Sequence, residues 1–174
     1  MVARLKERGL AFAPTTTTRA PRPSEREGVD YYFVSKGEFA AMVRNGELLE
    51  HAIVYGQEKG VTRAAVRKLL DAGRDVLLRV DVQGARYIKS IIPAAVTVFI
   101  TAPSEDDLRK RLAERNTESP EDLKLRLETA EAELAAKGEF DHVVVNDDLD
   151  RSTAEVEAII ERERSRGHRQ PITL

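Results

Sequence analysis

The chain has 174 residues, of which 41% are hydrophobic and 33% are charged, and its formal net charge is −2. This size fits one compact domain with room for a small subdomain. The near-neutral charge does not predict nucleic acid or an anionic membrane as a partner. The absence of cysteine excludes disulfides, thiolate metal sites and cysteine nucleophiles. No apolar run reaches membrane-spanning length and the start has no signal-peptide h-region, so we expect a cytoplasmic protein.

The first third of the chain predicts a mixed helical and extended region. Strand-like pieces occur at residues 28–34 and 48–54. Between them Ser35 and Glu38 form the S-x-x-E pattern of a capping box, which predicts the start of a helix. We interpret this region as a subdomain mounted on one edge of a sheet.

Three short apolar runs predict the strands of a parallel sheet. They lie at residues 76–78, 96–100 and 143–145. Because they lack polar alternation, we expect these strands to be covered on both faces. Helices are predicted around them, at residues 62–71, 104–114, 119–136 and 152–166. This alternation of strands and helices indicates an α/β fold.

The most informative segment is TTTTRAPRP, at residues 15–23. Its prolines keep the chain extended, so Arg19 and Arg22 do not share a helix face. Each guanidinium offers a planar fork of donors that suits phosphate oxygens. With the Tyr31 hydroxyl, the two arginines would form a cradle for a phosphate monoester. Taken alone, a solvated loop rich in arginine and proline is the more common alternative.

The motifs around this loop resemble the guanylate kinase family. T-T-R-x-P-R followed by E-x-x-G-x-D-Y-x-F-V-S covers residues 17–35. Further matches follow in the family's order, at residues 47–50, 80–84, 103–104, 115–118 and 144–150. The likeness covers essentially the whole chain and is greatest to the plant-organellar and related bacterial branch, which also reads L-R-V-D-[IV]-Q-G.

The resemblance implies a P-loop nucleoside-monophosphate-kinase-like fold, a parallel sheet with helices on both faces. It implies a core at residues 1–13 and 72–174, a helical lid at about 105–136, and a small mixed α+β subdomain that binds GMP at 14–71. The implied reaction transfers the γ-phosphate of ATP, with Mg²⁺ bound to the ATP, to GMP to give GDP. The implied partners are these nucleotides, and neither nucleic acid nor a membrane.

The resemblance also implies the residues of the GMP side of the site. Arg19, Arg22 and Tyr31 match phosphate ligands, and Thr15 falls where the family has a small hydroxyl residue near the guanine. Glu50 and Asp81 match carboxylates that accept hydrogen bonds from guanine N1–H and the exocyclic amine. Guanine presents adjacent donors that adenine lacks, and an ionised carboxylate is acceptor-only.

Three positions depart from the commonest family pattern. Lys59 stands where a phosphate-binding tyrosine is usual, and its ammonium group would supply a positive charge for the phosphate. Val61 stands where a guanine-binding Ser or Thr is usual, so guanine selectivity would rest more heavily on the two carboxylates. Arg79 replaces an acidic residue that is common two positions before Asp81. The resemblance fixes no role for it, and an approach to the phosphates or to magnesium is left open.

On the ATP side, the resemblance implies three catalytic lid arginines, Arg111, Arg115 and Arg126. Phosphoryl transfer depends mostly on positioning and charge neutralisation, so positively charged side chains on a closing lid are expected to stabilise the transferring group. Asn146 resembles the residue beside the adenine. The three histidines are isolated in the sequence and we assign them no role.

One family motif has no counterpart. No Gly is followed by Lys anywhere in the 174 residues, so the P-loop that cradles ATP phosphates, and the strand before it, are expected to be missing. Loss of a central strand removes roughly 10 kcal/mol of burial, against a net stability of about 5–15 kcal/mol. We therefore expect marginal stability and doubtful catalysis by this chain alone. The alternative function is a non-catalytic module that binds GMP or a phosphopeptide.

Overall fold

The computed structural model describes residues 1–54, 56–114, 120–166, 172 and 174. The chain packs into two compact units, which we describe separately. The N-terminal unit comprises Val2–Ala95 with Pro171–Leu174, and the C-terminal unit comprises Val96–Gln170 with Met1. The GMP-binding subdomain predicted at residues 14–71 is defined by ligand binding, so a division of the chain by packing does not test its boundaries.

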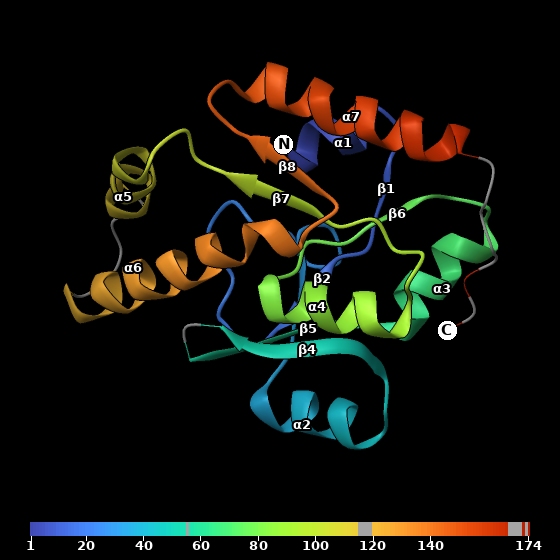
Figure 1. The fold of residues 1–174 in the computed structure, drawn as a ribbon. Coiled ribbons are helices and arrows are strands. Elements are labelled where there is room, and N and C mark those ends of the chain that lie inside the picture. Colours follow the sequence, from blue (N-terminus) through green and yellow to red (C-terminus); the bar gives the residue numbers. More distant parts are fainter. Residues whose placement is uncertain (55, 115–119, 167–171, 173) are drawn as a thin grey trace. The chain divides into compact units, whose positions relative to one another are not determined.

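A four-stranded mixed sheet forms a large part of the N-terminal unit (Figure 1). Its strands lie in the order β3 (Tyr31–Phe33), β2 (Thr15–Thr17), β5 (Gln57–Thr62) and β4 (Leu48–Val54). Strands β2 and β3 are parallel, whereas β5 runs antiparallel to both β2 and β4. The predicted strands at 28–34 and 48–54 are confirmed as β3 and β4, and the sequence analysis missed β2 and β5.

Local capping explains where two helices of this unit begin. The Ser35 hydroxyl accepts from the Glu38 N–H at 3.2 Å, and the Glu38 carboxylate accepts from the Ser35 N–H at 2.7 Å. The predicted capping box is therefore confirmed, and it opens α2 (Lys36–Arg44). In the same way, the Thr62 hydroxyl accepts from the Ala65 N–H at 3.2 Å and opens α3 (Arg63–Asp71).

A second, two-stranded parallel sheet completes the N-terminal unit. It pairs β1 (Ala11–Phe12), which follows α1 (Val2–Glu7), with β6 (Val76–Leu77). Helix α4 (Val82–Ile91) follows with Asp81 as its N-cap. The strand ends at Leu77, and the Asp81 carboxylate accepts from the Gly84 N–H at 2.7 Å, which caps the start of α4.

The C-terminal unit contains a parallel pair of strands, β7 (Val98–Thr101) and β8 (His142–Val145). The pair is joined by α5 (Glu105–Glu114), α6 (Pro120–Ala135) and a 3₁₀ helix at Ala136–Glu139, and α7 (Leu149–Ser165) packs against β8 (Figure 1). Helix α7 begins three residues before the predicted start, because the Asp148 carboxylate accepts from the Arg151 N–H at 2.8 Å and caps it.

The two faces of the β7–β8 pair differ in burial. Val144 is fully buried, whereas Val143 and Val145 are 42% and 43% exposed. Alternate residues of a strand point to opposite faces, so the prediction that these apolar strands are covered on both faces is wrong for this pair. Among the described residues, β1 pairs with β6 and β7 with β8 in two two-stranded parallel sheets, and the parallel pair β2–β3 belongs to the four-stranded mixed sheet. The further strand that the resemblance implies stays a prediction. Among the described helices, none has both the length and the apolar character needed to cross a membrane.

Candidate functional site

The arginine loop between β2 and β3 is organised around the Glu25 carboxylate. Arg19 donates from Nη1 to Glu25 Oε2 and from Nη2 to Oε1, both at 2.8 Å. The two side chains are only 12% and 13% exposed. This bidentate bond lowers the pKa of Glu25 and raises that of Arg19, in each case chiefly through the hydrogen bond between them. Arg19 is therefore held in one orientation as a charged partner of a charged carboxylate.

Aromatic rings hold Arg19 from another direction. Its guanidinium carbon lies 5.0 Å from the centre of the Tyr31 ring and 5.7 Å from that of Phe33. At these distances a cation is attracted by the electron-rich face of the ring. The structure thus brings Arg19 and Tyr31 together, as predicted for a phosphate cradle.

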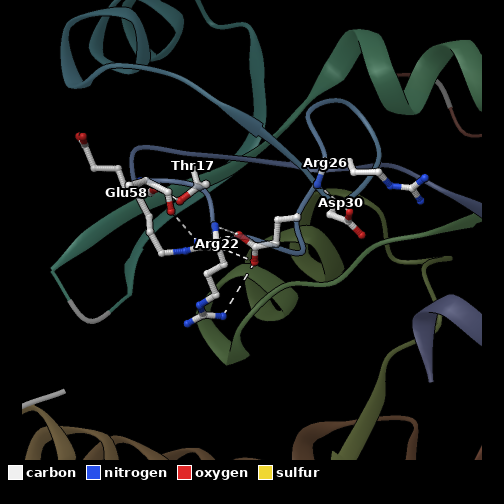
Figure 2. Close-up of polar contacts among 8 residues, drawn as sticks. Thr17, Arg22, Arg26, Asp30 and Glu58 are labelled. Atoms are coloured by element: carbon white, nitrogen blue, oxygen red, sulfur yellow. Dashed lines mark hydrogen bonds and ion pairs between the residues drawn. The ribbon is translucent and has the colours of Figure 1, made fainter. Parts of the chain in front are cut away.

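Arg22 lies in the same loop but is held much less tightly. Its backbone N–H donates to Glu25 Oε2 at 2.8 Å, while its Nη1 is 3.9 Å from Oε1 and its side chain is 53% exposed. In Figure 2 the Arg22 side chain extends away from Thr17 and Glu58, whose hydroxyl and carbonyl groups are hydrogen-bonded at 3.2 Å. Arg22 therefore presents most of its guanidinium to a ligand or to water.

One face of the four-stranded sheet carries most of the other predicted GMP ligands. Residues that pair directly across two strands point to the same face. The pairs are Thr15 with Tyr31, Thr17 with Lys59, and Glu50 with Val61. The alternation along β5 places Lys59 and Val61 on one face, and that along β2 places Thr15 and Thr17 there as well. The structure thus puts Thr15, Tyr31, Lys59 and Glu50 on a common surface.

Val61 is a residue of the hydrophobic core. It is fully buried in a core cluster with Ala13, Leu49 and Val66. At this position, where the family usually has a hydrogen-bonding residue, the chain thus places an apolar core residue opposite Glu50 on the neighbouring strand.

Glu50 is a buried carboxyl group with an unusual pKa. Only 5% of the residue is exposed. Burial raises its pKa to about 7, and the negative charge of Asp81 adds to the shift. The structure therefore brings the two predicted guanine-binding carboxylates together. Both belong to the N-terminal unit, on β4 and at the start of α4.

A cavity of about 320 Å³ opens beside Glu50. It is lined by residues of α2, β4, α3 and α4 and of the turn before β4, namely Val43, Gly46, Leu48, Leu49, Glu50, His51, Arg63 and Tyr87. This volume lies within the range of small-molecule sites, which combine apolar walls with a few polar groups. The other predicted GMP ligands do not line it.

The predicted ATP-side residues lie in the C-terminal unit or outside the described chain. Arg111 is exposed on α5 and Arg126 belongs to α6, whereas Arg115 lies outside the described residues. Asn146 follows β8 directly, and its side-chain oxygen accepts from the Ser152 hydroxyl at 3.0 Å. In the described residues, no three His, Asp or Glu side chains are grouped so that they could hold a metal ion.

A scan against protein families matches residues 1–163 to the model described as "Guanylate kinase". The chain belongs to the guanylate kinase family.

Individual guanylate kinases are similar to this chain over most of its length. A guanylate kinase from Alkalilimnicola ehrlichii is 42% identical over 165 residues, which cover 95% of this chain and 81% of the relative. "Guanylate kinase 2, chloroplastic/mitochondrial" from Oryza sativa subsp. japonica is 41% identical over 179 residues, which cover all of this chain and 63% of the relative. A crystal structure of guanylate kinase from Anaplasma phagocytophilum matches with a TM-score of 0.80 and 34% identity, covering 93% of this chain and 80% of that one.

Two residues of the guanylate kinase motifs gain a structural explanation that the sequence analysis missed. Glu25, the first residue of E-x-x-G-x-D-Y, orients Arg19, as described above. Gly84, the last residue of V-D-V-Q-G, lets the Glu50 carboxylate approach α4: a Cβ added there would lie 2.6 Å from Glu50 Oε2. Their positions in the motifs singled these two residues out, but their roles follow only from their contacts in the folded chain.

We expect Gly84→Ala to weaken GMP binding by about 10-fold without unfolding the protein. Alanine is the better helix former by about 1 kcal/mol. The added methyl would lie 2.6 Å from Glu50 Oε2 and 3.1 Å from Val80 Cβ; the end of the glutamate side chain is the more flexible of the two, so we expect Glu50 to shift and the fold to be kept. Calorimetric GMP titration and a thermal melt would measure the two effects. Gly37→Ala is a matched control in the first turn of α2, where the nearest atom would be 3.9 Å away. Unchanged GMP affinity in Gly84→Ala would contradict the prediction.

Proposed function

We propose that this chain is a guanylate kinase that transfers the γ-phosphoryl group of ATP to GMP, giving GDP and ADP. The observation that carries the proposal is the family match across residues 1–163. The arrangement of charged groups in the N-terminal unit supports it, because a loop of arginines and a pair of carboxylates suit the two ends of GMP.

The arginine loop would bind the phosphate of GMP. Arg19 still has donors that Glu25 and the Ala20 carbonyl do not use, since a guanidinium offers five N–H groups and these two partners take three. The Tyr31 side chain is a further hydrogen-bond partner of Arg19. Arg22 is exposed and close by. With the Tyr31 hydroxyl they would hold the acceptor phosphate as a positioned nucleophile, and Lys59 and Thr15 share the same sheet face.

The carboxylates would select guanine. Asp81 uses Oδ1 to accept the Gly84 N–H at 2.7 Å, which leaves its second oxygen for a guanine donor. Glu50 would accept from the adjacent donor when it is ionised. Adenine offers no such adjacent pair of donors, so it would leave buried acceptors unpaired.

On the ATP side, Mg²⁺ would enter as part of the MgATP substrate and reduce the charge of the transferring phosphoryl group. Arg111, Arg115 and Arg126 would supply further positive charge, and Asn146 would contact the adenine. An oxygen of the GMP phosphate attacks the γ-phosphorus, and the bond between that phosphorus and the β-bridging oxygen breaks. Neutralising and aligning the phosphates is most of what such a step requires.

Binding and turnover should be measured separately, because the 174 residues contain no Gly-Lys pair of the kind that ends the family's P-loop. Calorimetry with GMP and with MgATP reports binding, and a coupled assay for ADP reports transfer. GMP-dependent ADP production would support the kinase. GMP binding with neither ATP binding nor turnover would support a non-catalytic module instead, and absence of GMP binding would contradict the proposal.

Arg22→Ala is expected to weaken GMP binding by about 10-fold, because it removes an exposed cation that makes charge-assisted bonds to phosphate. Affinity for MgATP should stay within about twofold of the original value. Arg26→Ala is the matched control, since this exposed arginine lies in the same loop, where its backbone N–H donates to Asp30 at 3.0 Å (Figure 2). Equal loss for GMP and ATP would argue against the assignment of Arg22.

A further inference from the structure

We propose that Arg79 is a third arginine of the phosphate-binding site, fixed by aromatic rings rather than by a carboxylate. The inference rests on the proposed function, because it takes the GMP phosphate as the ligand. The sequence motifs left a role at the phosphates or at magnesium open for this residue and did not choose between them.

Arg79 lies against the same tyrosine as Arg19. Its guanidinium carbon is 4.8 Å from the centre of the Tyr31 ring, and that of Arg19 is 5.0 Å from it. The Phe12 ring is also close to Arg79, with its centre at 5.6 Å. Two guanidinium groups, from positions 60 residues apart in the sequence, therefore lie close to one tyrosine ring.

The backbone fixes Arg79 at this position as well. The segment that carries it joins β6 to α4, and the Arg79 carbonyl accepts a long hydrogen bond from the Thr15 hydroxyl at 3.5 Å. Thr15 in turn pairs with Tyr31 across β2 and β3. Two residues further on, Asp81 caps α4 beside Glu50. One short segment thus carries a cation next to the phosphate cradle and a carboxylate next to the guanine site.

The charge balance of the cradle favours a ligand role for Arg79. Arg19 is bound bidentately to Glu25, so the two together contribute almost no net charge. Arg22 is also within 4 Å of Glu25. Among the described residues, no carboxylate forms an ion pair with Arg79, whose neighbours are the two rings. A phosphate monoester carries about −1.5 to −2 charges, and Arg79 supplies positive charge that Glu25 does not cancel.

The ring contacts of Arg79 leave hydrogen-bond donors available. A guanidinium offers five N–H groups, and among the described residues Arg79 forms no ion pair that would use them. Arg79 can therefore stay close to Tyr31 and Phe12 while it donates to phosphate oxygens. A lysine would keep the charge but lose the planar fork of donors.

The test compares GMP with guanosine, which lacks the phosphate, by isothermal titration calorimetry on the full chain. Arg79→Gln should raise the Kd for GMP by about 10-fold and leave that for guanosine within about twofold. Arg79→Lys should fall between the original chain and the glutamine variant. Arg44→Gln is the matched control, because it removes the same charge from an exposed arginine at the end of α2 and should change neither affinity.

Two results would overturn the inference. An unchanged Kd for GMP in Arg79→Gln would show that this arginine does not reach the phosphate. Equal weakening of GMP and guanosine would show that it only supports the shape of the site through Tyr31. If the original chain bound neither ligand, the proposed function itself would fail, which is a separate result.

Discussion

Guanosine should bind this chain about 10-fold more tightly at pH 8 than at pH 6, because Glu50 ionises between these values. Burial raises the pKa of Glu50 to about 7, with a further contribution from Asp81. About a tenth of such a group is ionised one pH unit below its pKa, and about nine-tenths one unit above it. Only the ionised carboxylate accepts without also donating. Guanosine is the better probe than GMP, since the second ionisation of a phosphate monoester also lies near pH 6.

Glu50→Gln should remove this pH dependence and reduce the preference for GMP over AMP by about 100-fold. A side-chain amide can present its NH₂ where the site needs an acceptor, so two donors would face each other. Calorimetric titration of GMP, AMP and guanosine from pH 6 to 8 would measure both effects. Glu47→Gln is the matched control on the turn before β4, where the carboxylate accepts from Asn45 at 2.9 Å. A pH dependence that survives in Glu50→Gln would assign it to another group.

The same carboxyl group should affect stability with the opposite sign. The pKa of Glu50 in the folded chain lies above its ordinary value of 4.5, so the folded state holds this proton more tightly than the unfolded state. The contribution to stability is complete below about pH 4.5 and is lost as the pH rises through about 7, by at most about 3 kcal/mol. The pH that favours guanine binding is therefore one at which Glu50 destabilises the fold, and bound nucleotide would offset that loss.

Local signals allowed the sequence to predict several elements correctly. The capping box of Ser35 and Glu38 depends on residues three apart, and Thr62 caps α3 by the same short-range geometry. Family motifs placed Arg19 with Tyr31 and Glu50 with Asp81, and the fold brings each pair together. The caps could be predicted because they depend on residues three apart, and the two pairs because both members of each belong to family motifs.

Other contacts between distant segments could not be predicted from the sequence. Nothing in the order of residues shows that Gly84 faces the Glu50 carboxylate, or that the Arg79 guanidinium reaches the Tyr31 ring. Burial misled the prediction in one place: a wholly apolar run at β8 indicated cover on both faces, yet Val143 and Val145 are exposed. The apolar character of a residue indicates how much free energy its burial would contribute, but not which segment of the chain covers it.

Arg19→Ala is expected to have the largest effect of any single substitution in the phosphate cradle, raising the Kd for GMP by about 100-fold or more. Part of the loss is the charge-assisted bonding of Arg19 itself, worth about 10-fold or more. The rest comes from Glu25, whose pKa is lowered mainly by its hydrogen bond with Arg19. Without the arginine this carboxylate stays ionised at neutral pH and repels the GMP phosphate, so the substitution replaces a neutral pair with a negative charge.

A double variant separates these two contributions. Arg19→Ala with Glu25→Ala should bind GMP about 10-fold more tightly than Arg19→Ala alone, because the uncompensated carboxylate is gone. Glu25→Ala alone should weaken GMP binding only a few-fold, since Arg19 keeps its charge and its contact with Tyr31 but loses its fixed orientation. GMP titrations of the four proteins, with melting curves to confirm folding, complete the cycle. If the double variant bound GMP no better than Arg19→Ala, Glu25 would act only by orienting Arg19, and its carboxylate would not repel the GMP phosphate.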